Sequence, residues 1–205
     1  GSLSPMMMST ADKMLVFSDM YKDIYRYDGI SPKIFYSAGY IFNNIASVVV
    51  RNVEEHKSQL RKAGAKYVIC YFDESVQHNK WGVVSKNDQL DELHQLAQFV
   101  LDDKTVALVL KSQYMCNSPS QLYSNDTLIQ SAKTTGRYLE LMEGVHRNEI
   151  YPAEAALVSD ICISHKFVAT AGLEAAVVGV RTVLLDTYGV STAWDEVYAQ
   201  ADICY

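Results

Sequence analysis

From residue 53 onward, hydrophobic positions alternate between two spacings. Apolar residues recur every three or four positions within polar segments, as at 90, 93, 96, 97 and 100, which predicts amphipathic helices. Between these segments lie short, nearly continuous apolar runs such as YVICYF at 67–72, typical of buried parallel strands. The predicted helices cover 53–63, 88–103, 128–133, 152–159 and 170–178, and the predicted strands cover 67–72, 105–111, 138–141, 161–163, 182–185 and 201–205. This alternation predicts an α/β fold, a Rossmann-like three-layer structure with helices on both faces of a parallel sheet.

The first 52 residues follow a different arrangement. A strand at 13–18, a helix at 20–27 and a strand at 33–37 predict a small N-terminal βαβ unit. Residues 43–53 are less regular, and we expect a connector there. Residues 1–10 have neither a basic start nor an apolar core, so we expect a tag remnant and a disordered lead-in rather than a signal peptide.

Composition narrows the functional classes. A net charge of −6 argues against a protein whose main task is to bind nucleic acid. No apolar run approaches the length of about 18 residues that a transmembrane helix needs. The four cysteines form no CxxC pair and three lie in apolar runs, so we expect buried reduced thiols. The five histidines show no metal-ligand spacing, and we expect no metal site.

The segment Ser159–Asp186 carries the strongest candidate chemistry. It combines a strand, a loop, a helix start at Thr170-Ala171-Gly172 with Glu174 one turn in, and a second strand. The backbone N–H groups of such a helix start favour an anion, usually a phosphate, and Glu174 is placed to accept hydrogen bonds from ribose hydroxyls. Alternatively, Gly172 only lets helix and strand pack closely, and Glu174 only favours the helix dipole. Both interpretations remain open at this point.

Other candidate residues follow predicted strands, where ligands bind in open parallel sheets. Lys111 ends a strand and either meets a phosphate or is a solvated strand terminus. His165 either donates to a phosphate or makes a structural hydrogen bond. The loop at 146–152, with Arg147, either holds a flat base through its main chain or is an ordinary connection.

The long polar loop at 73–88 indicates function rather than simple connection. Its first carboxylates, Asp73 and Glu74, are adjacent and point in different directions, so they predict no acid/base pair. GxSxG, Walker A, GxGxxG and kinase motifs are absent, which weakens hydrolase, kinase and dehydrogenase interpretations.

The order PAEAALVSDICISH followed by ATAGLEAAVVGVRTVLLD resembles the donor-binding half of GT-B glycosyltransferases, most closely bacterial enzymes of surface-polysaccharide assembly. The same layout occurs in UDP-N-acetylglucosamine 2-epimerases. Upstream, residues 11–40 look like the closing βαβ unit of the first GT-B domain. The resemblance therefore implies that 11–52 is the end of a first domain and its linker, and that 53–205 is the nucleotide-sugar-binding domain, with the acceptor domain largely missing.

The resemblance also implies roles for individual residues. Glu174 matches the acid that binds the donor ribose, and Thr170, Ala171 and Gly172 match the turn that receives the diphosphate. The loop around Ile150, with Arg147 before it, corresponds to the nucleobase site; Lys111 corresponds to a basic strand end, and His165 lies beside the diphosphate turn. Phe167 stands seven residues before Glu174, where retaining members carry a second glutamate. This departure favours inverting chemistry or a loss of activity.

We therefore expect transfer of a sugar from a nucleotide diphosphate donor to a glycan hydroxyl, with no metal or other cofactor. The expected partners are a nucleotide sugar and, through the missing domain, a glycan or lipid-linked acceptor, but no nucleic acid. The catalytic base lies in the first domain in inverting members, so it is unknown here and this fragment is expected to be inactive alone. The implied location is the cytoplasm, at or near the inner face of the membrane.

Two alternatives remain. A UDP-sugar 2-epimerase would be favoured by clustering of Asp73, Glu74 and His165 around the ligand. A non-catalytic binding module would be favoured by a filled, apolar crevice above the strand ends.

Overall fold

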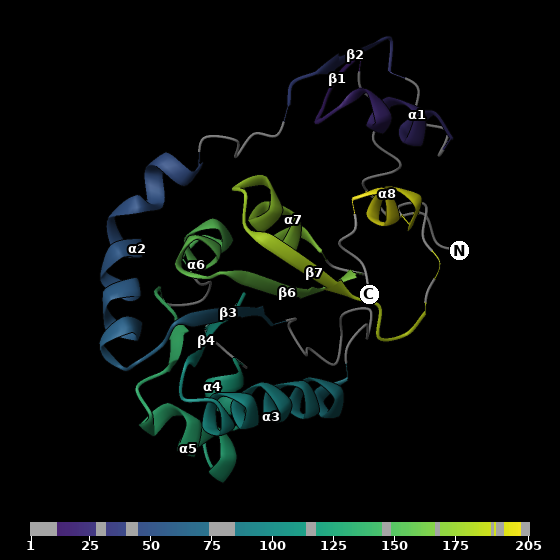
Figure 1. Cartoon of the computed structure of the whole chain (residues 1–205). Helices are drawn as coiled ribbons and strands as arrows, with labels where there is room; N and C mark the ends of the chain where they lie inside the picture. The colour runs from purple at the N-terminus through teal and green to yellow at the C-terminus, as the bar shows by residue number, and fades with distance from the viewer. Residues whose placement is uncertain are drawn as a thin grey trace. The chain divides into compact units, whose positions relative to one another are not determined.

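The computed structural model describes residues 12–27, 32–39, 45–73, 85–113, 118–144, 149–166, 169–189, 191 and 195–201. The chain divides into two compact units, residues 1–44 and 45–205 (Figure 1).

The smaller unit is a βαβ motif, as the sequence predicts. Strand β1 (Lys13–Val16) pairs in parallel with β2 (Ile34–Ser37), and helix α1 (Asp19–Tyr27) connects them. Val16 is buried at 4% exposure, whereas Leu15, Ile34 and Tyr36 are exposed. The apolar interior of this unit is therefore small.

The larger unit contains a five-stranded, fully parallel sheet in the order β5-β4-β3-β6-β7. Its strands are β3 (Tyr67–Phe72), β4 (Val106–Lys111), β5 (Tyr138–Leu141), β6 (Ile161–His165) and β7 (Arg181–Leu185). Within this sheet, the chain first forms the central strand β3 and then runs outward through β4 to β5. It then crosses back to form β6 on the other side of β3. This is a Rossmann-like α/β fold, which confirms the predicted fold class.

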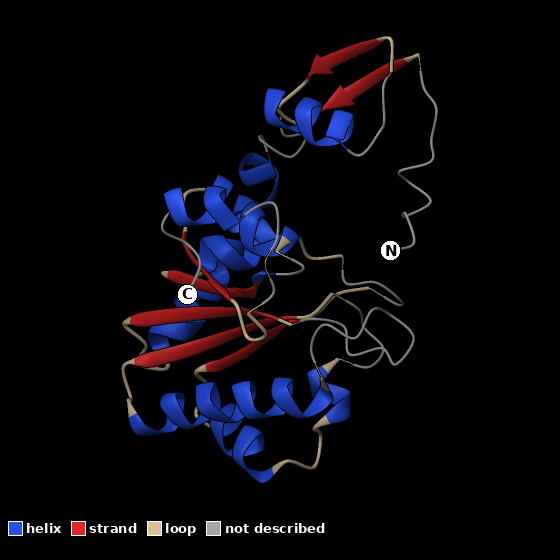
Figure 2. Cartoon of the chain, turned by 90° about the vertical axis from the view of Figure 1, so that its right-hand side faces the viewer, coloured by secondary structure: helices blue, strands red, loops and turns tan. Residues whose placement is uncertain are grey.

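Helices cover both faces of this sheet (Figure 2). One face packs against α2 (Ile45–Lys62), α6 (Pro152–Val158) and α7 (Thr170–Val177), and we call it the α6 face. The opposite face, which we call the α3 face, packs against α3 (Lys86–Asp102) and α5 (Thr127–Thr134). Two short helices complete the unit, α4 (Pro119–Leu122) and α8 (Asp195–Gln200).

Side chains of the central strands point alternately into the apolar cluster on the α3 face and the one on the α6 face. In β4, Val106, Leu108 and Leu110 lie in the apolar cluster on the α3 face, whereas Ala107 and Val109 lie in the cluster on the α6 face. All six residues of β4 are buried. A strand buried on both faces requires the continuous apolar run that the sequence shows.

Several predicted boundaries were wrong. The predicted connector at 43–53 is helical from Ile45, because Val49 packs in a small cluster with Ala153 of α6. The β-branched run at 48–50 has low intrinsic helix propensity, and this tertiary contact overrides it. Strand β6 continues through Ser164 and His165.

Two helices were not predicted. α4 occupies part of the expected loop after residue 111, and α8 precedes the strand predicted at 201–205. Ala201 lies in a turn after α8, and residues 202–205 lie outside the described part of the chain.

Cys70 and Cys162 occupy paired positions on β3 and β6. Both are free, buried thiols, which confirms the prediction for these two residues, and burial raises the pKa of Cys70 well above its usual range. Cys116 and Cys204 lie outside the described residues.

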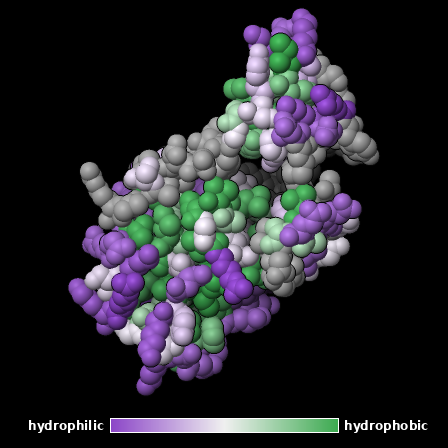
Figure 3. Space-filling model, turned by 45° about the horizontal axis from the view of Figure 1, so that its top comes forward, coloured by the Kyte–Doolittle hydropathy of each residue, from purple (hydrophilic) through white to green (hydrophobic). Residues whose placement is uncertain are grey.

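The surface mixes hydrophobic and polar residues (Figure 3). Among the exposed hydrophobic residues of the larger unit are Tyr67, Phe99, Leu173 and Val177. Across the described ranges, no helix has both the length and the hydrophobicity that crossing a membrane would require.

Candidate functional site

The strand order creates a topological switch point between β3 and β6. From β3 the chain proceeds to β4 on one side, and from β6 it proceeds to β7 on the other. Counted along the larger unit, the strands lie in the order 3-2-1-4-5. In open sheets of this kind the crevice for ligands lies beyond the carboxyl ends of the strands at the switch point.

The predicted site residues on these strand ends project to opposite faces. Lys111 lies two residues after Val109, so alternation places both side chains on the α6 face. His165 contacts Glu92 of α3 and therefore lies on the α3 face. The carboxyl edge thus carries two separate groups of polar residues.

On the α6 face, the side chain of Glu174 in α7 forms a hydrogen bond with the start of α6. Its Oε1 accepts a hydrogen bond of 2.9 Å from the backbone N–H of Ala153, in the first turn of α6. Glu174 is buried at 6% exposure. Its carboxylate thus stabilises the N-terminus of a neighbouring helix, a role that neither sequence interpretation included.

Gly172 is required by packing. A Cβ atom at this position would lie 2.8 Å from Cβ of Ser164 and 2.9 Å from Cδ2 of Leu184. The absence of a side chain therefore lets α7 approach β6 and β7 closely, which supports the packing interpretation of this residue.

The first three N–H groups of α7 have no partner within the helix. The first helical bond runs from the N–H of Leu173 to the carbonyl of Ala169 at 2.7 Å, so the N–H groups of Thr170, Ala171 and Gly172 precede it. Ala169, at the N-cap position, provides no side-chain hydrogen bond. Such an end carries the positive part of the helix dipole.

The remaining predicted residues of this face have mixed outcomes. Ile150 and Ala171 are half-buried and pack against the same apolar cluster, which includes Ala155 and Ala156 of α6. Lys111 is buried, and its Nζ donates to the carbonyl of Ser112 at 2.7 Å, so it is not a solvated strand terminus. Arg147, like Glu74, lies outside the described residues.

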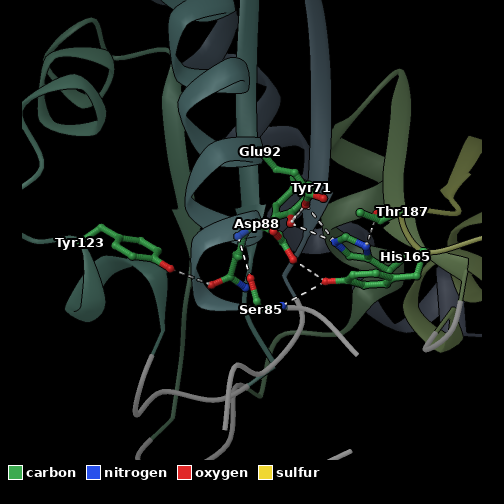
Figure 4. A network of polar contacts seen from close by, with 9 residues as sticks. Tyr71, Ser85, Asp88, Glu92, Tyr123, His165 and Thr187 are labelled. Carbon is green, nitrogen blue, oxygen red and sulfur yellow. Dashed lines mark hydrogen bonds and ion pairs between the residues drawn. The ribbon is translucent and has the colours of Figure 1, made fainter. Parts of the chain in front are cut away.

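On the α3 face, the buried side chain of His165 is the centre of a polar network (Figure 4). Its Nε2 lies 3.0 Å from Oε2 of Glu92 and 3.3 Å from the hydroxyl of Tyr71. The Tyr71 hydroxyl itself donates to Oε2 of Glu92 at 2.5 Å. On the other side of the ring, Nδ1 lies 3.5 Å from Oγ1 of Thr187, which follows β7.

A second set of contacts ties the segment after β7 to the start of α3 (Figure 4). The hydroxyl of Tyr188 donates to Oδ2 of Asp88 at 2.5 Å and accepts from the N–H of Ser85 at 3.2 Å. The Tyr188 hydrogen bond is the main cause that lowers the pKa of Asp88. Nearby, Tyr123 donates to the carbonyl of Lys86 at 2.9 Å.

Asp73 follows β3 and turns toward β4. Its N–H donates to the carbonyl of Lys111 at 3.2 Å, and its Oδ1 accepts from the N–H of Gln113 at 3.1 Å. Burial raises the pKa of Asp73 to about 7, against the opposing effects of Ser112, Gln113 and Lys111. This carboxyl group therefore changes its protonation state near neutral pH.

The structure adds Tyr71, Glu92, Thr187 and Tyr188 to the residues that the sequence singles out. A signal for Tyr71 exists, because a tyrosine in a buried strand needs a partner for its hydroxyl. Glu92 has no such signal, since a carboxylate on an amphipathic helix is ordinary. Within the described ranges, no three His, Cys, Asp or Glu residues gather where they could hold a metal ion.

Comparison with known proteins finds likeness only among solved structures. No protein-family model and no curated protein matches the chain. Among solved structures, a variant of the wall teichoic acid polymerase TagF aligns with a TM-score of 0.39 and 15% sequence identity, over 85% of this chain and 39% of that chain. The chain thus spans about two fifths of that polymerase.

Proposed function

We propose that the larger unit binds a nucleoside diphosphate sugar and serves as the donor-binding domain of a glycosyltransferase. One observation carries the proposal. The N-terminus of α7 and the buried carboxylate of Glu174 lie on one face of the sheet, at the carboxyl edge where the strand order reverses.

The start of α7 is the proposed diphosphate site. Backbone N–H groups at a helix N-terminus point at an anion, and the helix dipole favours negative charge there. These groups also stabilise the charge that develops on a diphosphate as it leaves the sugar. Thr170 is exposed at this end, so its hydroxyl adds a donor for the same ligand.

Glu174 is the proposed ribose residue. A carboxylate offers about four lone-pair positions, so one oxygen can hold the N–H of Ala153 while the group also accepts from ribose hydroxyls. The main chain around Ile150, at the start of α6, is the proposed nucleobase contact. In this proposal the larger unit holds the donor, and a separate domain supplies the acceptor hydroxyl and the base that deprotonates it.

Calorimetric titration of the whole chain with UDP, CDP and GDP tests the proposal. We expect binding of at least one nucleotide, and a loss of about tenfold or more in affinity for Glu174→Gln, since hydrogen bonds to a charged group are the stronger ones. Glutamine keeps an oxygen for the N–H of Ala153, so the fold should survive.

Glu55→Gln is the matched control, because Glu55 is exposed on α2 and loses the same charge. Thermal melts of both variants check that the fold is intact. Absence of binding to all three nucleotides would refute the proposal, as would equal weakening by both variants. Conversion of a UDP-sugar to its C2 epimer in the same samples would favour the epimerase alternative instead.

A further inference from the structure

Three consecutive residues after β7 contact three different parts of the larger unit. The carboxylate of Asp186 lies 2.7 Å from the ammonium group of Lys166, which follows β6. Oγ1 of Thr187 lies 3.5 Å from Nδ1 of His165, at the end of β6. The hydroxyl of Tyr188 reaches the first turn of α3. This segment therefore runs from the end of β7 past the end of β6 to the start of α3.

A tight turn shapes the segment. The N–H of Gly189 donates to the carbonyl of Asp186 at 3.4 Å, which closes a β-turn. Gly189 has a φ of 59°, in the left-handed region that favours glycine. The side chains of Thr187 and Tyr188, at the tip of the turn, are exposed. We call residues 186–189 the strap.

The hydroxyl of Tyr188 attaches the strap to α3. It donates its proton to Oδ2 of Asp88 and accepts from the N–H of Ser85, the N-cap of the helix. Within the described part of the chain, all hydrogen bonds between the strap and the start of α3 involve this hydroxyl. Tyr188 is 47% exposed, so little burial holds its ring in place.

The strap occupies one side of the buried His165 ring. Figure 4 shows the ring between Thr187 on one side and Tyr71 and Glu92 on the other. Both ring nitrogens therefore face protein groups, and His165 is only 2% exposed. Tyr71 and Glu92 belong to β3 and α3, whereas Thr187 belongs to the exposed turn. Movement of the strap alone would therefore uncover Nδ1 and leave the other contacts in place.

We propose that residues 186–189 form a movable strap, latched by Tyr188, that controls access to His165. In the closed arrangement Thr187 covers Nδ1. When the Tyr188 hydroxyl leaves Asp88 and Ser85, the strap lifts, and Nδ1 becomes reachable by solvent and by polar ligands. The inference goes beyond the proposed function and does not depend on it, because the proposed diphosphate site lies on the α6 face.

The strap can open while the sheet stays intact. Its tip is exposed, and segments of this kind open with less free energy than global unfolding needs. Strands β6 and β7, by contrast, pair along five residues each and contribute the buried side chains of Cys162 and Leu184. The ion pair between Asp186 and Lys166 holds the base of the strap next to β7.

Chemical modification of the whole chain with diethyl pyrocarbonate, which acylates accessible imidazoles, tests the inference. Tyr188→Phe keeps the ring and removes both hydrogen bonds, and we expect it to raise the modification rate of His165 about fivefold. Mass spectrometry of the peptides reads the rate at each histidine. His94, on the same helix but paired with Asp126, is the internal reference and should react at an unchanged rate.

Tyr67→Phe is the matched control, because Tyr67 is exposed and begins β3 at the opposite end of the strand. It should leave the rate at His165 unchanged. Hydrogen exchange in Tyr188→Phe should accelerate at Ser85 and in residues 186–189, but not in β6 or β7. A latch that controls access is overturned if His165 stays equally protected in Tyr188→Phe, or if Tyr67→Phe accelerates its modification as much. Faster exchange throughout β6 and β7 would overturn it as well, since the strap would then open only with the sheet.

Discussion

Glu174 stabilises the fold and lies in the candidate site at the same time. Its carboxylate holds the N–H of Ala153, and loss of such a cap costs about 1 kcal/mol. An alanine at this position would therefore lower both stability and ligand affinity, and the two effects could not be separated. This is why glutamine, which keeps the acceptor and removes the charge, is the informative substitution.

Asp73 should make the stability of the larger unit depend on pH. Burial raises its pKa to about 7 in the folded chain, against about 3.9 in an unfolded one. The folded state therefore binds the proton more tightly, and this stabilisation is complete below about pH 4 and is lost as the pH rises to about 7. The full effect is at most about 4 kcal/mol.

Urea unfolding of the unaltered chain and of Asp73→Asn between about pH 4 and pH 8 measures this dependence. Asparagine keeps an oxygen for the N–H of Gln113 and does not titrate, so its variant should gain stability relative to the unaltered chain as the pH rises. Parallel curves for the two proteins would show that Asp73 keeps an ordinary carboxyl pKa.

The sequence identified candidate site residues better than it identified the residues that they contact. It offered two interpretations of Gly172, and the close approach of this residue to Ser164 and Leu184 is visible only in the structure. His165 stood out beside a strand end, but Tyr71 lies 94 positions away in the sequence. No local pattern reports a contact over that separation.

Elements were predictable where hydrophobic spacing alone determines them. Strands β3 and β5 have the predicted bounds, and YVICYF of β3 is the continuous apolar run typical of a buried parallel strand. Helix α8 was missed, since its six residues are too few to show a helical period and other elements hold the helix. Its anchor is the buried ammonium of Lys166, which contacts Asp186 after β7 and Asp195 in the first turn of α8.

Asp195→Asn should therefore loosen α8. Its contact with Lys166 is partly exposed, so we expect a loss below about 1 kcal/mol in global stability. Amide hydrogen exchange in residues 195–200 should nevertheless accelerate clearly, since local opening needs less free energy than global unfolding. Glu196→Gln removes the same charge from the same turn without touching Lys166, and it should leave exchange unchanged. Similar acceleration in both variants would mean that the helix dipole, not the ion pair, holds α8.

The order of strands is a property of the whole molecule. Alternation of strands and helices predicts a parallel sheet, but many orders satisfy it, and the switch point exists only because β6 pairs with β3. That pairing brings Cys162 beside Cys70 and positions His165 to reach Tyr71. The candidate site therefore depends on contacts between distant segments, and the sequence could indicate it only through a resemblance.

Because the chain divides into two compact units, we expect the two units to unfold independently. The βαβ motif of the smaller unit buries little apolar surface, and a two-stranded sheet is only marginally stable. Val16→Ala removes buried methyl groups from it and should cost about 1 kcal/mol or more, enough to abolish most amide protection in residues 13–37.

Hydrogen exchange followed by mass spectrometry tests this directly. Because β3 and β4 belong to a separate apolar core, their amides should keep full protection in Val16→Ala. Val53→Ala is the reciprocal variant, with nearly the same burial (5% against 4%) but within α2 of the larger unit, and it should lower protection in β3 while sparing residues 13–37. If either substitution lowers protection in both segments, the two units unfold as one cooperative body, and the N-terminal motif is then part of the fold that holds the candidate site.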